Sequence, residues 1–349
     1  MQTDERKNGG KGTCFEETVP AVRKRGWDLL IWGSVVLFTL LYLSLIFNNN
    51  VWTDEIFSVN LFRENFGQII MDTAEDVHPP LYYFLGRIFR LLFGDSLQVQ
   101  KILTIIPMSL TLVLGATKIR RFFGNGVSFL FLIFLGCIPC SMEYAVQIRM
   151  YSWALLCVTA CALAAWEIYR DGRWSSWIML SVSAVAAAYL HYFSFVSVII
   201  INGLLLLVLL LTKENRKKLG KWVLFSLLMV AAYLPWLPYF YTQVTRVEAG
   251  YWIRERGGFA FFCMAVPTLT AAGGIILSFM KQPIYRDQYV FPAMGLFCLF
   301  LAIGCVRMRK EAVVLILVFL LFTGGISYRD AFRAEYKATL TEQTEEFFR

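Results

Sequence analysis

Charged side chains are scarce in this sequence: of 349 residues, 17% are Asp, Glu, Lys or Arg, whereas 58% are hydrophobic. A soluble domain carries about 25% charged residues, so the composition argues against a soluble protein. Apolar runs of about twenty residues recur along the chain, which is the length that an α-helix needs to cross a bilayer. The sequence therefore predicts an all-α polytopic membrane protein.

Histidine is rarer still, with 2 residues, and most of the 8 cysteines lie inside apolar runs. Cys137 and Cys140 are one helical turn apart and are better explained as small packing residues than as metal ligands. We therefore expect neither a disulfide framework nor a zinc site. The net charge of +8 does not indicate nucleic-acid binding. The basic residues form short clusters between the apolar runs, where the positive-inside rule expects them.

The N-terminal segment, residues 1–26, is polar and ends in three basic residues, Arg23 to Arg25. The positive-inside rule predicts that it is a cytoplasmic tail. An apolar run from Leu29 to Phe47 follows, and three asparagines come after it in place of the small residues of a signal-peptide cleavage site. The run is therefore predicted to be an uncleaved membrane anchor.

Four further basic clusters, around Lys118, Arg170, Lys217 and Arg307, separate the later apolar runs and should also be cytoplasmic. The spans expected between them are residues 100–117, 126–142, 150–169, 174–190, 193–212 and 221–241. This alternation predicts that Arg149 and His191 lie on the outer side of the membrane. The first outer loop, residues 48–99, lies on the same side.

Residues 79–93, "PPLYYFLGRIFRLLF", are apolar but short for a span. Arg87 and Arg90 are three residues apart, so they share a helix face. If this stretch spanned the membrane, the cluster at Lys118 would lie outside, so we predict an amphipathic helix in the outer interface. The alternative is a short span that breaks the charge rule. Residues 259–280 raise the same question, and the expected total is about nine to eleven transmembrane helices.

Paired carboxylates open the first outer loop: Asp54 and Glu55 follow the first span directly, beside Trp52. A carboxylate at that boundary is partly removed from water. This is the placement that a general base at an interface needs, so Asp54 is the stronger candidate of the loop acids.

A second group in the same loop consists of Asp76 and His78, which precede a pair of prolines. The prolines end any preceding helix and direct both side chains to the membrane boundary. The alternative is that the loop acids are only solvated charges, which is the better explanation for Asp72 and Glu75.

Basic and aromatic residues mark other outer ends of spans. In "QIRMYS", Arg149 precedes Tyr151 and could hold a phosphate through two parallel hydrogen bonds, or could extend towards lipid headgroups. In "YLHYF", His191 is either a residue of the aromatic belt or a neighbour of His78. Further candidates beside spans, each of which could instead form a local ion pair, are Arg246, Arg286 and Tyr289.

Taken in order, these motifs resemble a known family. The first-loop "DE", then "HPPLYY", "IRMYS", "YLHYF", "LPWLP…GYWI" and "RDQYVFP" occur in the order seen in bacterial membrane glycosyltransferases of the GT-C class. The sequence is most similar to the family 39 branch, relatives of the protein mannosyltransferases and of the aminoarabinose transferases that modify lipid A. The resemblance runs from about residue 27 to about residue 306. It implies a GT-C-like helical bundle in a transmembrane glycosyltransferase domain at residues 27–327.

The resemblance also implies a reaction. Such enzymes of the plasma (inner) membrane take a sugar from a polyprenyl-phosphate donor on the outer face. They pass it, with inversion, to a hydroxyl of a glycan, lipid or protein acceptor. Asp54 would be the general base and Glu55 would orient the acceptor or sugar, while Arg149, with Arg246 or Arg286, would stabilise the leaving phosphate. The other residues expected to bind the donor are Asp76, His78, Tyr151, His191 and Tyr289.

The sequence departs from the family pattern in several places. Gln147 stands where relatives often have an acid before "RMY", so a divalent cation bound by outer-loop acids stays an open question. Residues 328–349 resemble the beginning of an outer domain, which predicts a polar extracytoplasmic tail and a C-terminally truncated member of the family. The alternative function is a transporter or flippase of polyprenyl-linked lipids. It predicts ionisable residues deep within the spans, and the sequence has few.

Overall fold

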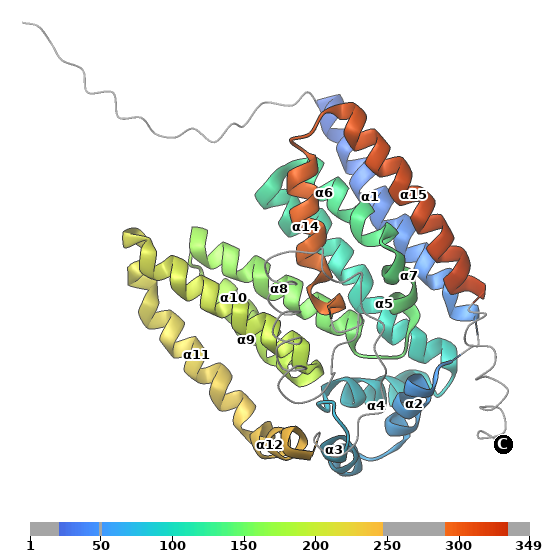
Figure 1. Ribbon diagram of the computed structural model, residues 1–349, viewed down its shortest axis with the longest axis vertical. Helices are drawn as coiled ribbons and strands as arrows, with labels where there is room; N and C mark the ends of the chain where they lie inside the picture. Colours follow the sequence, from blue (N-terminus) through green and yellow to red (C-terminus); the bar gives the residue numbers. More distant parts are fainter. Residues whose placement is uncertain (1–20, 49–50, 247–289, 334–349) are drawn as a thin grey trace, which may run out of the picture.

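The computed structural model describes residues 21–48, 51–246 and 290–333, and within these ranges every element is a helix (Figure 1). The longer helices are α1 (Ala21–Ser44), α5 (Leu97–Leu114), α6 (Arg120–Cys137), α8 (Tyr151–Arg170), α9 (Trp174–Leu190), α10 (Tyr192–Leu211), α11 (Leu219–Tyr233), α14 (Met294–Cys305) and α15 (Lys310–Arg333). The short helices are α2 (Thr53–Arg63), α3 (Phe66–Glu75), α4 (Leu81–Phe93), α7 (Pro139–Val146) and α12 (Leu237–Arg246). The predicted all-α class is confirmed.

The candidate membrane spans agree with the apolar runs of the sequence. Among the described residues, six helical stretches are long and apolar enough to cross a membrane: Arg25–Phe47, Leu97–Cys137, Tyr151–Arg170, Tyr192–Leu211, Lys213–Gln243 and Lys310–Arg333. The second stretch turns back at Gly124, whose φ of 88° suits glycine, and Ser128 of α6 donates to the Gly115 carbonyl. That stretch therefore counts as two candidate spans. Two shorter apolar helices, Trp174–Leu190 and Phe291–Cys305, are further candidates, so the described ranges hold nine candidate membrane spans. The chain is thus an integral, multi-pass membrane protein.

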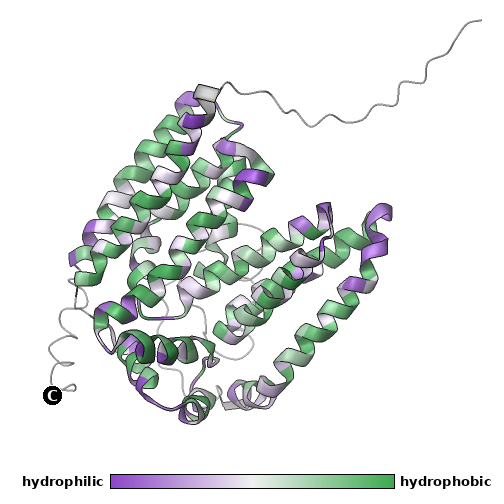
Figure 2. Ribbon diagram, turned by 180° about the vertical axis from the view of Figure 1, so that it is seen from behind, coloured by the Kyte–Doolittle hydropathy of each residue, from purple (hydrophilic) through white to green (hydrophobic). Residues whose placement is uncertain are grey.

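The helices form two packed groups that meet at α8 (Figure 1). In the first group α6 packs on α1, α14 and α15, and α5 packs on α1 and α8. In the second group α9 packs on α8, α10 and α11. The first and last helices are joined near one end, where the hydroxyls of Ser44 and Tyr328 lie 2.8 Å apart. The apolar outer surfaces of both groups (Figure 2) are the faces that a bilayer would cover.

Basic residues from distant parts of the chain meet at one end of the bundle. The buried carboxylate of Glu167, at the end of α8, accepts from Lys118 at 2.7 Å and from Arg173 at 2.5 Å. Lys218 donates to two carbonyls of the last turn of α8, and Arg120 pairs with Asp28 of α1 at 2.5 Å. The predicted clustering of these charges at one end is therefore present, since opposite charges and helix carbonyls draw them together.

The first-loop helices α2, α3 and α4 lie across the other end of the bundle (Figure 1). With 13 residues, α4 is about 20 Å long, which is too short to cross a bilayer. Its inner face buries Tyr82, Tyr83 and Gly86, whereas Leu91 and Phe93 are exposed. The amphipathic helix predicted for residues 79–93 is therefore present from Leu81 to Phe93.

The predicted segment boundaries fall inside helices. α1 begins at Ala21, before the predicted end of the tail at residue 26, and α15 continues to Arg333, beyond the predicted boundary at residue 327. Both helices extend past their apolar runs into polar residues, because the backbone hydrogen bonding of a helix does not stop where hydrophobicity does. The run at 259–280 lies outside the described residues.

Candidate active site

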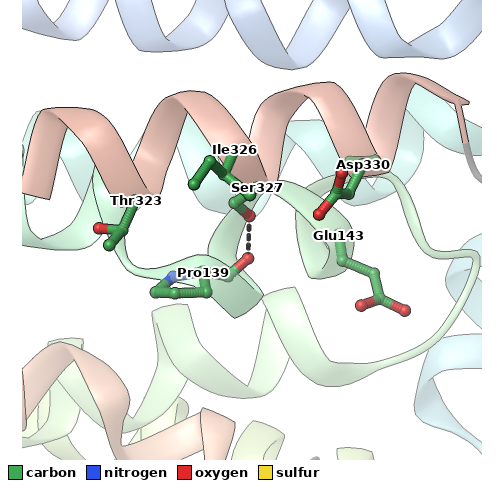
Figure 3. A pocket seen from close by; sticks show the side chains of 7 residues that line it. Pro139, Glu143, Thr323, Ile326, Ser327 and Asp330 are labelled. Carbon is green, nitrogen blue, oxygen red and sulfur yellow. Dashed lines mark hydrogen bonds between the residues drawn. The ribbon is translucent and has the colours of Figure 1, made fainter.

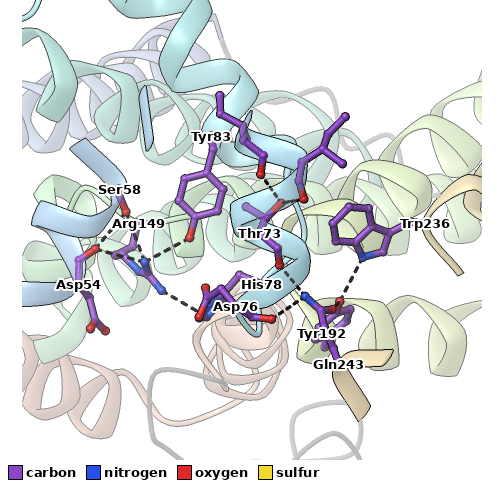
Figure 4. A network of polar contacts seen from close by, with 12 residues as sticks. Asp54, Ser58, Thr73, Asp76, His78, Tyr83, Arg149, Tyr192, Trp236 and Gln243 are labelled. Carbon is purple, nitrogen blue, oxygen red and sulfur yellow. Dashed lines mark hydrogen bonds and ion pairs between the residues drawn. The ribbon is translucent and has the colours of Figure 1, made fainter. Parts of the chain in front are cut away.

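Asp54 and Arg149 meet at the end of the bundle covered by the first-loop helices (Figure 4). Asp54 lies in the first turn of α2, and its backbone carbonyl accepts from the Arg149 guanidinium at 3.2 Å. Its half-buried carboxylate points away from the guanidinium, and no described residue bonds to it (Figure 4). The structure thus brings together two residues that the sequence predicted on the same side of the membrane.

Glu55 is fully buried, with no exposed surface. One carboxylate oxygen accepts the backbone N–H of Trp52 at 2.8 Å, which caps α2, and the other accepts the backbone N–H of Ile148 at 2.9 Å. A carboxylate used in this way holds the backbone on both sides of the site. The predicted role, orientation of an acceptor or sugar, differs from what these contacts indicate.

Arg149 is a buried cation, 3% exposed, whose described partners are all electrically neutral or uncharged groups. In addition to the Asp54 carbonyl, its Nη1 donates to the hydroxyls of Ser58 and Tyr83, each at 3.3 Å, and Nη2 lies 3.2 Å from Nε2 of His78. No described residue bonds to its Nε, and no described carboxylate forms an ion pair with it. The charges of Asp54 and Asp76 are near enough to stabilise this cation, but no described carboxylate bonds to it directly, so the guanidinium can still bind an anion.

Asp76 and His78 form a hydrogen-bonded pair beside Arg149. His78 Nδ1 lies 2.9 Å from the Asp76 carboxylate. Since Arg149 can only donate, His78 Nε2 accepts from it, which places the proton of the neutral ring on Nδ1. Burial raises the pKa of Asp76, but the hydrogen bond from His78 and the nearby charge of Arg149 outweigh burial and lower this pKa below its usual value. The pair thus fixes the ring that supports the guanidinium.

The two histidines are neighbours, as the predicted topology required. The His191 ring, between α9 and α10, lies 5.7 Å from that of His78 and 5.6 Å from that of Tyr151. Its Nδ1 accepts the backbone N–H of Phe193 and so begins α10. Burial, followed by the nearby charge of Arg149, lowers the pKa of His191 well below its usual value. Tyr151 is buried in the same cluster.

Three of the predicted side chains cannot be placed relative to this site. Arg286 and Tyr289 lie outside the residues that the structure describes, as does the side chain of Arg246. Two residues of the network were not singled out from the sequence. Ser58 is one turn after Asp54, a spacing that could have indicated it. Gln243, 4% exposed, joins α12 to the turn between α3 and α4. No local pattern predicts that contact.

Two hollows border the bundle. A lateral groove of about 520 Å³ lies between α9, α10 and α11, lined by apolar side chains such as Val198 and Met229. It reaches Phe240, whose ring is 5.0 Å from that of Tyr192 in the polar network. A smaller pocket of about 310 Å³ lies between α7 and α15, beside Glu143 and Asp330 (Figure 3), and none of the candidate catalytic residues line it. Of these two hollows, the groove is the one that reaches a residue in contact with the polar network.

Metal ligands are not grouped in the part of the chain that the structure describes: no three His, Cys, Asp or Glu side chains converge there. The site therefore consists, within these ranges, of a buried cation, an available carboxylate and a supporting Asp–His pair.

Comparison with known proteins gives a family-model match over part of the chain and a similar fold. Residues 77–239 match the model of the family described as dolichyl-phosphate-mannose-protein mannosyltransferase. The crystal structure of ArnT from Cupriavidus metallidurans in the apo state is similar, with a TM-score of 0.54 and 16% sequence identity over 83% of this chain and 61% of that chain. The chain thus spans about three fifths of that structure. No curated protein matches the sequence significantly. These findings confirm the resemblance and the GT-C-like fold predicted from the sequence.

Proposed function

We propose that this relative of the dolichyl-phosphate-mannose-protein mannosyltransferases transfers a sugar from a polyprenyl-phosphate donor to an acceptor hydroxyl. The reaction takes place at the end of the bundle that holds Asp54 and Arg149. The observation that carries the proposal is the buried Arg149 guanidinium, which has neutral described partners and lies next to an available carboxylate. A lipid phosphate would bind this guanidinium through charge-assisted hydrogen bonds.

The proposed chemistry uses a carboxylate and a cation that lie in one site, Asp54 and Arg149. Asp54 accepts the proton of the acceptor hydroxyl, the hydroxyl oxygen forms a bond to the anomeric carbon, and the bond from that carbon to the phosphate oxygen breaks. The electron pair leaves with the phosphate, whose increased negative charge Arg149 stabilises. The products are the glycosylated acceptor and polyprenyl phosphate.

A single displacement, with inversion, fits the state of the second carboxylate. A double displacement needs a carboxylate nucleophile as well as a proton carrier, by analogy with retaining hydrolases. Glu55 is buried and both its oxygens accept backbone N–H groups, which makes it a poor nucleophile. Asp76 is engaged by His78. Asp54 therefore remains as the base of an inverting reaction.

The remaining predicted residues take supporting roles in this proposal. His78 and Asp76 orient the guanidinium. His191 packs against His78, and Tyr151 packs against His191. Additional phosphate or sugar contacts from Arg246, Arg286 and Tyr289 remain part of the proposal. Glu55 holds the Arg149 segment and does not touch the substrate.

The lipid half of the donor fits the lateral groove. Its walls, from α9, α10 and α11, are apolar along the groove, and they reach Phe240 and Tyr233 near the polar network. A polyprenyl chain is apolar and can enter sideways from the bilayer between two helices. Its phosphate would then lie at the same end of the bundle as Arg149.

The orientation follows from the charges at the two ends. The basic residues around Glu167 lie at the end opposite Asp54, and the positive-inside rule predicts that they face the cytoplasm. The active site then faces the outer side of the plasma membrane. Glycan, lipid and protein acceptors with a free hydroxyl would approach from there.

Binding of undecaprenyl phosphate to the purified protein in detergent tests the proposal, with native mass spectrometry as the readout. The wild-type protein should bind it, and Arg149→Ala should weaken the affinity about ten- to a hundredfold, because charge-assisted hydrogen bonds are lost. Arg329→Ala, which removes an exposed arginine of α15, is the matched control and should bind normally. Absence of wild-type binding would overturn the proposal.

A second readout separates transfer from transport. Incubation of the enzyme with polyprenyl-phosphate sugars and an acceptor should release free polyprenyl phosphate, because the bond between sugar and phosphate breaks. A transporter or flippase would leave that bond intact in micelles, where there is no bilayer to cross.

A further inference from the structure

Gln243 of α12 makes three hydrogen bonds with its carboxamide (Figure 4). Its Nε2 donates to the backbone carbonyls of Thr73, at 2.6 Å, and Asp76, at 2.7 Å. Its Oε1 accepts from the hydroxyl of Tyr192, which in turn accepts from the indole N–H of Trp236 at 3.1 Å. The side chain thus joins α12 and α10 to the turn between α3 and α4.

Only a glutamine side chain satisfies these contacts. Nε2 has two N–H groups and meets two carbonyl oxygens, while Oε1 meets a hydroxyl donor, so each group is used. A glutamate would place an oxygen against the carbonyls of Thr73 and Asp76, and an aliphatic residue would leave buried polar atoms without hydrogen bonds. Because each polar group of the carboxamide has a hydrogen-bond partner, these contacts fix the position of α12 relative to the α3–α4 turn more closely than packing alone would.

The contact leads to the candidate phosphate site through two residues. Gln243 holds the backbone of Asp76, the Asp76 carboxylate accepts from His78 Nδ1, and His78 Nε2 accepts from the Arg149 guanidinium. If the α3–α4 turn moves, the Asp76 carboxylate moves with it, and His78 loses the contact that keeps its proton on Nδ1. Arg149 then loses a hydrogen-bond acceptor, and its guanidinium is no longer held in one orientation.

We propose that Gln243 is a positioning residue for phosphate binding, which acts through Asp76 and His78 to orient Arg149. The inference rests on the proposed function. Gln243 lies on the segment that follows α11, whose side chains form one wall of the groove, so the same connection holds the lipid groove and the phosphate site in register.

The test uses Gln243→Met in the full-length protein, because methionine keeps the length of the side chain and removes all three hydrogen bonds. Its matched control is Tyr241→Phe, on the same helix at a side chain that is 71% exposed. We expect Gln243→Met to weaken undecaprenyl phosphate binding and raise the donor KM by about ten- to a hundredfold, since small displacements of a positioned group have effects of that order. The control should be unchanged.

A purely structural role predicts a different result: kcat falls with the active fraction, and the donor KM does not change. If Gln243→Met does not fold, Tyr192→Phe removes the hydroxyl that donates to Oε1 and accepts from Trp236. It leaves the two hydrogen bonds of Nε2 in place and should raise the donor KM by a smaller factor. Adding Gln243→Met to Arg149→Lys should have little further effect on affinity, because a flexible ammonium does not depend on the direction set by His78.

The outcomes separate the two proposals. If the wild-type protein does not bind undecaprenyl phosphate, the proposed function fails. If the wild-type protein binds it and folded Gln243→Met binds equally well, the proposed function stands and the positioning role of Gln243 is wrong.

Discussion

Glu55 accepts a hydrogen bond from the backbone N–H of Ile148 at 2.9 Å, although the two residues are 93 positions apart in the chain. The contact places the start of α2, with Asp54, against the segment that carries Arg149. The second acid of the pair therefore sets the distance between the proposed base and the proposed phosphate ligand. Four predictions about the site and its surroundings follow from contacts of this kind.

Glu55→Gln should destabilise the protein by about 1–3 kcal/mol, because an amide has one acceptor oxygen and its NH₂ group would face a buried backbone N–H. It should also weaken lipid-phosphate binding by displacing Arg149. Thermal unfolding in detergent and the binding assay measure the two effects. Glu64→Gln, at an exposed residue after α2, is the control. An unchanged unfolding temperature would show that the two hydrogen bonds of the Glu55 carboxylate do not stabilise the fold.

Asp54→Asn should reduce kcat by a factor on the order of 10²–10⁴, because the amide cannot accept the proton of the acceptor hydroxyl. Binding of undecaprenyl phosphate should stay near the wild-type value, since Arg149 contacts the backbone carbonyl of Asp54 and not its side chain. Asp72→Asn serves as the control in the same loop. Full transferase activity of Asp54→Asn would remove Asp54 from the mechanism.

Because His191 is buried, the protein should become less stable as the pH falls. The pKa of His191 in the folded protein lies well below the ordinary value of about 6.5, because of burial and the neighbouring charge of Arg149. The rings of His78 and Tyr151 also face His191. The contribution of the neutral His191 ring to the free energy of unfolding is complete above about pH 6.5. It is lost as the pH falls below this value, at about 1.4 kcal/mol per pH unit for one proton. Asp76, whose pKa is lowered, contributes a loss only below about pH 4.

The variant His191→Asn should remove the loss between about pH 6.5 and pH 4.5, because asparagine can still cap α10 but does not titrate. Unfolding temperatures of the wild-type and variant proteins across this range measure the difference. Parallel curves for the two proteins would show that another group controls the response.

Gly86→Ala should destabilise the first-loop helices by about 1–3 kcal/mol, as overpacking does. A Cβ atom at Gly86 would lie 2.1 Å from the ring of Phe62, which packs on Tyr82 and Tyr83. Gly33→Ala, in α1 with open space around it, should not destabilise. Adding Phe62→Leu to Gly86→Ala should restore part of the loss; no recovery would show that the strain lies elsewhere.

The sequence predicted the parts of this architecture that depend on local composition. Hydropathy gave the positions of α5, α6, α8, α9, α10 and α11, because burial in lipid requires apolar residues over a whole helix. Charge clusters predicted that Asp54, His78, Arg149 and His191 share one end. These are signals that a single segment carries without reference to its neighbours.

The roles of Glu55 and Gln243 could not be predicted in this way. Each acts on a backbone group far away in sequence, Glu55 on Ile148 and Gln243 on Asp76, and a backbone N–H or carbonyl has no sequence signature. The neutral surroundings of Arg149 likewise depend on which groups the fold brings to it. Sequence indicated a cation at this place but not that its described hydrogen-bond partners are all uncharged groups.

The contact of Ser44 in α1 with Tyr328 in α15 joins residues 284 positions apart. During synthesis α1 is the first of these helices to leave the ribosome and α15 is the last, so α1 must reside in the lipid without this partner while all the intervening helices are inserted. The contact between α1 and α15 therefore forms only after the helices between them have been made. Insertion of α15 closes the face of α6, where Gly324 allows close approach to Cys137, and ends the period in which that face is open to the insertion machinery.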